Sequence, residues 1–147
     1  MNKNKGCLLT ILLMVFVVLI IIPWQRNRNE IIITKLVNDN IEFLNESVNE
    51  KNYDRIYQIE RIKKIRKYSF DENETFIDFF CTGVGIAPSG AYYGFYYTSL
   101  DKPRGFQSGD ETLEKNEDYW KWNQVNGDNY YKTKRIKAHW YYYEAGF

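Results

Sequence analysis

The chain has 147 residues, with 20 basic and 19 acidic side chains and a formal net charge of +1. This length accommodates one domain of ordinary size plus an appendage. Without Lys3 and Lys5 the remainder carries a net charge near −1, which gives no long-range field that would attract nucleic acid. We therefore exclude nucleic acid as a partner. The two cysteines, Cys7 and Cys81, lie in segments of different character, so no disulfide is expected.

An apolar stretch without charged residues occupies residues 6–24. At ~1.5 Å per residue a helix of this length reaches about 28 Å, close to the ~30 Å hydrocarbon thickness of a bilayer. Trp24 stands where an interfacial aromatic belongs, and Pro23 can end the helix. The end of the stretch lacks the small residues that signal peptidase requires, and Cys7 precedes it, unlike a lipoprotein cysteine. We predict an uncleaved transmembrane anchor that binds the lipid bilayer.

The residues around this stretch predict how the chain is organised across the membrane. Lys3 and Lys5 favour a cytoplasmic tail over residues 1–5. Residues 25–29 form a short polar linker, and residues 30–147 form a water-soluble domain. We predict a single-pass protein of the cell membrane with its N-terminus inside and its C-terminal domain outside.

The first part of the domain has helical periodicity. Apolar residues spaced by three and four predict one amphipathic helix near 30–49, with Ile33, Leu36, Val37, Ile41, Leu44 and Val48 on its apolar side. Asn52 is a suitable N-cap for a short second helix with Tyr53, Ile56 and Ile59 on one side.

Beyond about residue 62, aromatic and branched residues predict a sheet. The expected strands are 62–70, 75–82, 91–99, 119–124, 129–136 and 139–144. The acidic stretch 109–118 is predicted to be a loop, and Asn126-Gly127 is a hairpin signal. Short connections favour antiparallel neighbours. The expected fold is α+β, with one or two helices packed on an antiparallel meander of five or six strands, a layout compatible with a cystatin-like or NTF2-like arrangement.

The C-terminal part carries two aromatic motifs. Residues 126–131 read NGDNYY, and residues 140–144 read WYYYE. This pattern resembles short membrane-anchored proteins of Gram-positive bacteria, over about the last half of the chain. The motifs are not catalytic, and the group has no established function to carry over.

Catalysis of the Cys-His kind would depend on His139, the single histidine, with Cys81 as the thiol. Alternation along strands places Cys81 beside Ile77 and Phe79 and places His139 on the face of Tyr141. A thiol among large apolar neighbours is usually an inert core residue. A lone histidine without CxxC or HxxxH spacing does not indicate zinc. We predict no catalytic residues, no metal site and no cofactor.

Three further segments invite functional interpretations. The glycine-rich residues 83–90 lack the third glycine of a dinucleotide fingerprint and precede a strand, so we expect an exposed hairpin loop where a ligand contact is plausible. The acidic residues of 110–118 lack calcium-loop spacing. The basic run 61–67 contains isoleucines, which favours a structural element with a solvated charged edge over a site for polyanions or lipid headgroups.

Aromatic density is the remaining signal, with 13 Tyr, 9 Phe and 4 Trp. Tyrosines suit both stabilising cross-strand ladders and recognition surfaces. Asp78 interrupts an apolar strand, and if buried it needs a tyrosine hydroxyl or a basic side chain from 62–70 as partner. The candidate binding residues are Asp78, Tyr92, Tyr96, Tyr141 and Tyr143.

These features predict a membrane-tethered, non-enzymatic binding or accessory module at the cell envelope. Its expected partner, besides the bilayer, is another envelope protein, a peptide or a glycan. The alternative is an envelope enzyme that uses a carboxylate and tyrosines on the sheet.

Overall fold

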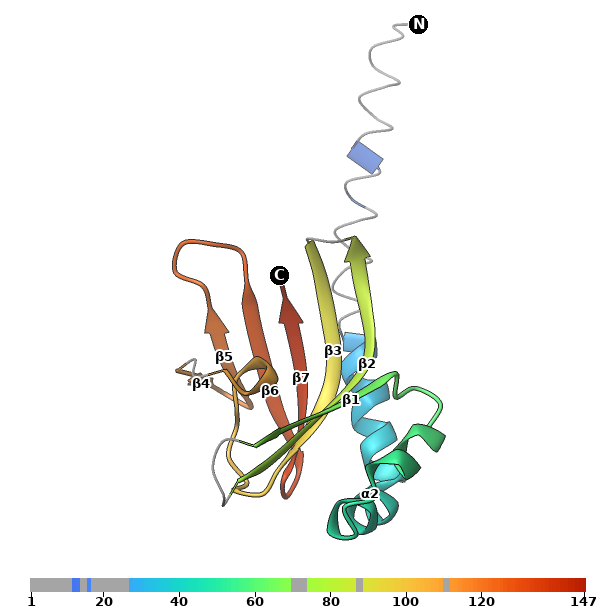
Figure 1. Cartoon of the computed structure of the whole chain (residues 1–147). Helices are drawn as coiled ribbons and strands as arrows, with labels where there is room; N and C mark the ends of the chain where they lie inside the picture. The colour runs from blue at the N-terminus through green and yellow to red at the C-terminus, as the bar shows by residue number, and fades with distance from the viewer. Residues whose placement is uncertain (1–11, 14–15, 17–26, 70–73, 87–88, 110–111) are drawn as a thin grey trace, which may run out of the picture. The chain divides into compact units, whose positions relative to one another are not determined.

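The computed structural model describes residues 12–13, 16, 27–69, 74–86, 89–109 and 112–147. The chain divides into two compact units, Met1–Ile32 and Ile33–Phe147. The described residues of the first unit are helical. The second unit is an α+β domain in which helical segments pack on a single antiparallel sheet (Figure 1). The predicted fold class of the C-terminal domain is confirmed.

The membrane anchor was predicted for residues 6–24. These residues lie outside the described part of the chain, except for residues 12, 13 and 16. Within the described ranges, no helix combines the length and the apolar character needed to cross a membrane.

The helix expected near 30–49 is present but is interrupted once. Residues 27–39 form a helix, and α2 (Ile41–Asn49) follows it. Asn40 separates them with φ −116° and ψ 15°, and its side-chain Nδ2 donates to the Leu36 carbonyl at 2.8 Å. Asparagine competes with helix continuation through such local hydrogen bonds. The prediction of one unbroken helix is therefore wrong at Asn40.

The short second helix is a 3-10 helix, η1 (Tyr53–Gln58). Asn52 precedes it, although its side chain makes no capping hydrogen bond. Ile56 is fully buried, and Tyr53 and Ile59 are partly buried against the same core. The apolar side predicted for this segment is confirmed.

Seven strands form the sheet, whereas five or six were predicted. Their bounds are β1 (Lys64–Ser69), β2 (Thr75–Ile86), β3 (Ser89–Thr98), β4 (Glu114–Asn116), β5 (Tyr119–Asn123), β6 (Tyr130–Lys137) and β7 (Trp140–Gly146). β4 falls in the stretch that was predicted to be a loop. All three of its side chains are exposed, so it shows none of the apolar alternation that predicts a strand.

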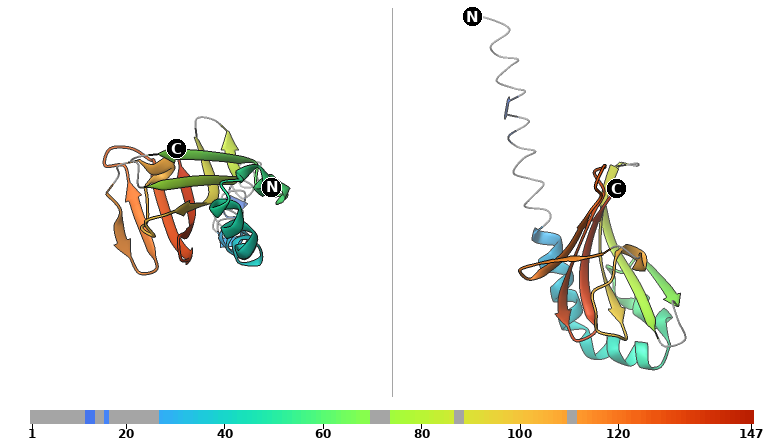
Figure 2. Two further views of the ribbon diagram at one scale, coloured as in Figure 1. Left: turned by 60° about the horizontal axis from the view of Figure 1, so that its bottom comes forward. Right: turned by 90° about the vertical axis from the view of Figure 1, so that its left-hand side faces the viewer.

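The strand order is β1-β2-β3-β7-β6-β5-β4, so the sheet is not the single meander expected. β1 to β3 form one meander and β4 to β7 form another. The two join where β3 pairs antiparallel with β7, from Ala91↔Gly146 to Tyr97↔Trp140. Figures 1 and 2 show β7 (red) between β3 and β6 in a strongly twisted sheet. Every residue of β7 is buried, because other parts of the domain cover both of its faces.

One face of the sheet, here called the helix face, carries Ile77, Phe79, Phe95, Trp140 and Tyr142. These side chains pack in one core with helical residues that include Ile33, Leu36, Val37, Leu44 and Ile56. Burial of this much apolar surface is the main source of stability in such a domain.

The opposite face, here called the pocket face, carries Phe76, Tyr96, Tyr131, Tyr141 and Tyr143. Within the described residues of the N-terminal half, no helix packs there. The connection from β3 lies over it instead, and its described part, residues 99–109, is here called the cover segment. This segment contains η2 (Phe106–Ser108), whose phenylalanine ring packs against the tyrosines.

Candidate functional site

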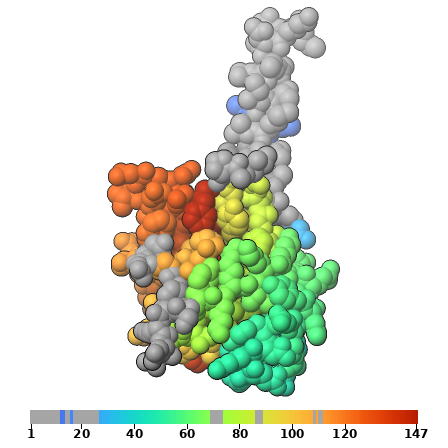
Figure 3. Space-filling view, viewed as in Figure 1, coloured from blue at the N-terminus to red at the C-terminus, as the bar shows by residue number. Residues whose placement is uncertain are grey.

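A pocket of about 460 Å³ opens on the pocket face between β1 and the cover segment. Its lining comes from parts of the chain that are distant in sequence. The lining residues are Lys64, Arg66, Phe80, Tyr92, Phe106, Gln107 and Phe147. Figure 3 shows β1 (green), the cover segment (light orange) and the end of β7 (red) meeting on one surface. The volume lies within the range of small-molecule sites.

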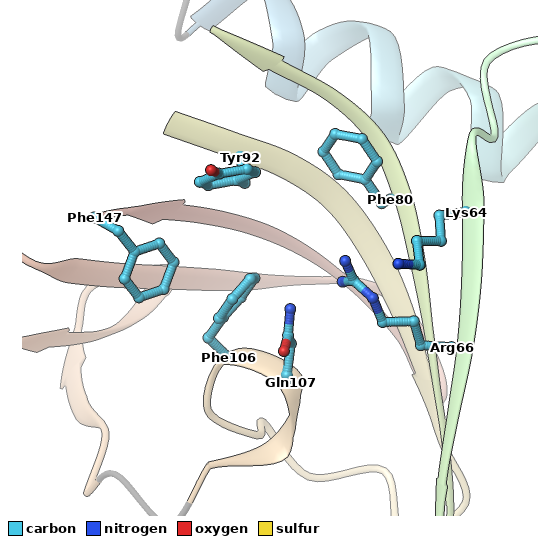
Figure 4. Close-up of a pocket in the computed structure, with 7 residues that line it drawn as sticks. All are labelled: Lys64, Arg66, Phe80, Tyr92, Phe106, Gln107 and Phe147. Atoms are coloured by element: carbon cyan, nitrogen blue, oxygen red, sulfur yellow. The ribbon is translucent and has the colours of Figure 1, made fainter. Parts of the chain in front are cut away.

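β1 supplies the two cations of the pocket. In the register of β1 with β2, Lys64 lies opposite Phe80 and Arg66 lies opposite Asp78, so alternation sends all four side chains to the pocket face. Figure 4 shows both basic side chains directed into the space between β1 and η2. Arg66 Nη1 donates to Asp78 Oδ2 at 3.0 Å, whereas Lys64 has no ion pair within the described part of the chain. The described lining residues, together with Asp78, therefore carry one excess positive charge.

Asp78 lies beneath the pocket wall with only 2% of its surface exposed. Burial raises the pKa of its carboxyl, although Tyr143, Arg66 and Lys64 act in the opposite direction. The prediction that a basic side chain from 62–70 would partner Asp78 is confirmed by Arg66. Because a buried carboxylate needs a counter-charge, Asp78 also holds Arg66 in place.

Tyr143 is the second buried polar group near this ion pair. Its hydroxyl forms no hydrogen bond of ordinary geometry with the described residues, although it interacts electrostatically with Asp78. Burial, and then the charge of Asp78, raise the pKa of Tyr143 well above its usual value. Its ring fits the sheet because Gly94 lies opposite. A Cβ at Gly94 would come within 2.7 Å of the Tyr143 ring and 2.3 Å of the Phe79 carbonyl oxygen.

Aromatic rings form the apolar wall of the pocket. The Tyr92 ring lies 6.2 Å from that of Phe80 and 5.9 Å from that of Phe147, measured between centroids. Phe147 in turn lies 4.9 Å from Phe106 of η2. The backbone of Phe147 exchanges two hydrogen bonds with Gly90, which fixes the end of the β7 pairing at the pocket. Figure 4 shows Tyr92, Phe106 and Phe147 on one side of the space and the two cations on the other, with Phe80 next to Lys64.

The cover segment is fixed to the sheet by polar contacts at its first half. The Arg104 amide donates to the Tyr96 hydroxyl at 3.0 Å, and the Arg104 guanidinium forms a two-point ion pair with the buried Glu74. The Tyr141 hydroxyl donates to the Asp101 carbonyl at 2.9 Å. These anchors hold η2, and with it one rim of the pocket, in a defined position.

Gln107 has an unusual backbone conformation within η2. Its φ of 49° and ψ of 31° are left-handed, a conformation that costs a residue with a side chain about 1 kcal/mol. Figure 4 shows its side chain extending into the pocket beside Phe106. The strained backbone therefore directs an amide group to the rim of the site.

The structure separates the predicted binding residues. Tyr92 lines the pocket, and Asp78 lies just beneath it. Tyr96, Tyr141 and Tyr143 are 0%, 1% and 2% exposed. These three rings are therefore not part of an exposed binding surface, because the cover segment packs over them.

Six of the lining residues were not among the sequence candidates: Lys64, Arg66, Phe80, Phe106, Gln107 and Phe147. Lys64, Arg66 and Phe80 could have been predicted to share one face of the sheet, because residues alternate along the expected strands 62–70 and 75–82, which are neighbours. The basic run leads into the edge strand β1 with Arg61, Lys63, Lys64 and Lys67 exposed, as predicted for a solvated charged edge, and Lys64 and Arg66 also line the pocket. No sequence pattern pointed to η2. In the glycine-rich hairpin the strands continue further than predicted, with Gly85 paired to Gly90, and its glycines do not line the pocket.

Cys81 and His139 lie in different environments. Cys81 lies with Ile77 in the helix-face core, as predicted, and burial raises the pKa of its thiol to about 12, so the nucleophilic thiolate is disfavoured. His139 does not share the face of Tyr141. It precedes β7 in a turn with φ 68°, and its ring stacks on Tyr97 at 5.7 Å. The prediction that β7 begins at His139 is therefore wrong by one residue.

Across the described ranges, no three or more His, Cys, Asp or Glu side chains gather as a metal site. Comparisons with protein-family models, with curated proteins and with solved structures found no match for this chain. Function is therefore inferred from the pocket and its surroundings.

Proposed function

We propose that this protein is a membrane-tethered, non-enzymatic binding module at the cell envelope, and that the pocket is its ligand site. The observation that carries this proposal is the convergence of seven side chains from β1, β2, β3, η2 and the end of β7 on one cavity. Their mixture of apolar rings with a few polar groups is typical of sites that bind small organic ligands.

The pocket has a rigid frame, which supports a binding role. Phe106 packs on buried tyrosines with centroid distances of 6.1 Å to Tyr131 and 5.7 Å to Tyr143. The ion pair of Arg104 with Glu74 holds the same segment two residues before Phe106. A preformed site loses little conformational entropy when it takes a ligand, which favours affinity.

The chemistry of the lining favours binding over the enzyme alternative. That alternative requires a carboxylate and tyrosine hydroxyls at the surface of the site. Among the lining residues that the structure describes, Tyr92 is the one tyrosine and none is a carboxylate. Asp78 is buried and occupied by Arg66, and Cys81 lies in the core of the helix face. We therefore place the protein among binding modules.

The tether is supported by the sequence of residues 6–24, which is uncharged and of bilayer length. Leu12, Leu13 and Phe16 are helical, and 66%, 65% and 63% of their surfaces are exposed, as expected for side chains that need lipid contact. An anchor raises the concentration of the domain near envelope ligands. The outward orientation, the resemblance to Gram-positive membrane-anchored proteins and the cystatin-like or NTF2-like layout stay predictions.

Photo-crosslinking in intact membranes tests the ligand site. The full chain carries p-benzoylphenylalanine in place of Tyr92, and the control carries it in place of Val125, which is 93% exposed in the β5–β6 turn. After irradiation, mass spectrometry of the chain is expected to detect an adduct of defined mass at position 92 and none at 125. Absence of an adduct at 92, or the same adducts at both positions, would contradict the proposal.

Reporter fusions test the membrane orientation separately. Alkaline phosphatase and green fluorescent protein are each fused after Phe147. An outward domain is expected to give phosphatase activity and no fluorescence. The opposite pattern would place the pocket in the cytoplasm and remove the envelope from the proposal while leaving the binding site intact.

A further inference from the structure

The charges around the pocket define the ligand more narrowly. Arg66 and Asp78 form an ion pair with an N–O distance of 3.0 Å, so their charges cancel. Lys64, two residues earlier on the same strand, also faces the pocket; it lowers the pKa of Asp78 through its charge but forms no ion pair among the residues described. Building on the proposed function, we infer that the pocket binds a small organic monoanion with an aromatic or alkyl body, whose acidic group meets Lys64 and Arg66.

The number of charges favours a monoanion. A cation would meet Lys64 and Arg66 directly and would be repelled by both. A dianion would leave one negative charge without a counter-ion above the buried Asp78, where it would also meet repulsion. A single negative charge neutralises the one excess cation. Arg66 has further N–H donors besides the one bonded to Asp78, so it can donate to the ligand without releasing that carboxylate.

The rings define the rest of the ligand. Phe80, Tyr92, Phe106 and Phe147 present apolar surface to the space, and Tyr92, Phe106 and Phe147 lie on the side away from the cations (Figure 4). A fully polar anion such as inorganic phosphate would leave these rings in contact with water and gain nothing from them. A flat or flexible apolar body would fill the space between them. The Gln107 side chain at the rim can form a hydrogen bond to a polar group at the other end of the ligand.

Equilibrium dialysis with matched probes tests this inference on the full chain in phosphatidylcholine nanodiscs, with empty nanodiscs as the blank. The probes are 2-naphthylacetate and octanoate, each compared with its neutral amide. The monoanions are expected to bind at least about tenfold more tightly than the amides. Lys64→Gln should abolish this preference. Lys63→Gln, which removes an exposed neighbouring cation that does not line the pocket, should preserve it.

The outcomes separate this inference from the proposed function. Equal binding of anion and amide, weakened by Phe106→Ala, would overturn the monoanion assignment and leave the ligand pocket standing. Failure of all four probes to bind would overturn both. A preference for the anion that survives Lys64→Gln would overturn the assignment of the acidic group to Lys64.

A second arm identifies the source of the monoanion, which is either a soluble carboxylate or an anionic lipid headgroup. Nanodiscs containing phosphatidylglycerol replace the zwitterionic ones. If the lipid headgroup is the ligand, 2-naphthylacetate should be displaced from the wild-type chain. If a soluble carboxylate is the ligand, binding of the probe should change by less than about twofold. Both results support a monoanion site and differ in its source.

Discussion

The two faces of the sheet are built from the same strands but serve different purposes. On the helix face, Phe79, Phe95 and Trp140 are fully buried among aliphatic side chains, and the indole of Trp140 donates to Asn45 Oδ1 at 2.8 Å. On the pocket face, tyrosine hydroxyls, a buried carboxylate and an ion pair lie beside an open cavity. Side chains fill the helix face, whereas a cavity lies on the pocket face.

This difference shows where stability and function are separated. A close-packed apolar face tolerates little change, because any lost volume leaves a cavity. On a face with buried polar groups, each group needs a hydrogen-bond or ion-pair partner. The positions of these partners specify one packing arrangement. The predictions below test whether the two faces behave in these two ways.

The largest effect is expected for Trp140→Ala on the helix face. The substitution removes a fully buried indole that contacts Phe79 and Phe95, with centroid distances of 5.8 and 5.9 Å. We expect the free energy of unfolding to fall by about 3–5 kcal/mol. Urea unfolding of the full chain in micelles, followed by circular dichroism, measures this. Trp122→Ala, at a half-buried position, is the control, and an equal loss in both variants would contradict the difference between the faces.

A smaller loss is expected for Arg66→Met on the pocket face. The substitution leaves the Asp78 carboxylate buried without its ion-pair partner, which should destabilise the domain by about 3 kcal/mol. Adding Asp78→Leu should recover most of that loss, because an apolar pair needs no counter-charge. The same unfolding assay measures both variants. If the double variant is less stable than Arg66→Met, the ion pair is not the source of the effect.

Gly94→Ala tests the close contact between β3 and the Tyr143 ring. The added methyl group would meet the Phe79 carbonyl oxygen first and the Tyr143 ring at 2.7 Å, so we expect these two clashes together to cost about 1–3 kcal/mol. Gly83→Ala is the matched control, because the nearest atom to its Cβ is 3.3 Å away. Similar stability of the two variants in urea would show that the pocket face adapts to added volume.

The smallest effect concerns pH and Asp101. Burial alone would raise the pKa of this carboxyl, but hydrogen bonds from the His139 amide, Arg135 and Tyr141 lower it overall. The ionised carboxylate therefore stabilises the fold above its unfolded pKa of about 3.9, and this contribution is lost as pH falls through the lower folded value.

Asp101→Asn should reduce stability by about 1 kcal/mol at pH 7, and the difference from wild type should shrink as the pH falls through the lowered folded pKa of Asp101. Unfolding midpoints measured from pH 7 to pH 2 give this difference. Asp128→Asn in the exposed β5–β6 turn is the control. A difference between Asp101→Asn and wild type that stays constant with pH would show that the charge of Asp101 is not involved.

Much of the fold could be predicted because its elements carry local signals. The apolar spacing from Ile33 to Val48 predicted the helical segment, and the aromatic and branched runs predicted six of the seven strands. The Asn126-Gly127 pair predicted the β5–β6 hairpin, in which Gln124 N–H donates to the Asn129 carbonyl at 2.9 Å. The placement of Cys81 in the core also followed from alternation.

The strand order and the pocket could not be predicted from local sequence patterns. Nothing near Tyr96 or Tyr141 in the sequence indicates that β3 and β7 pair, because their register joins residues about 45 positions apart. The pocket depends on that pairing, since it brings Phe147 beside Tyr92. Phe106 and Gln107 lie in an irregular segment, where side-chain direction follows from tertiary contacts rather than from periodicity.

The central place of β7 has a consequence for how the protein is made. Ribosomes release the chain from its N-terminus, so β3 exists well before residues 140–146 emerge. Until then the edge of β3 that will receive β7 has unpaired amide and carbonyl groups and can pair with another chain. The two halves of the sheet become one only when β7 inserts between them. Completion of the domain, and of the cavity beside Phe147, is therefore a late event in biosynthesis.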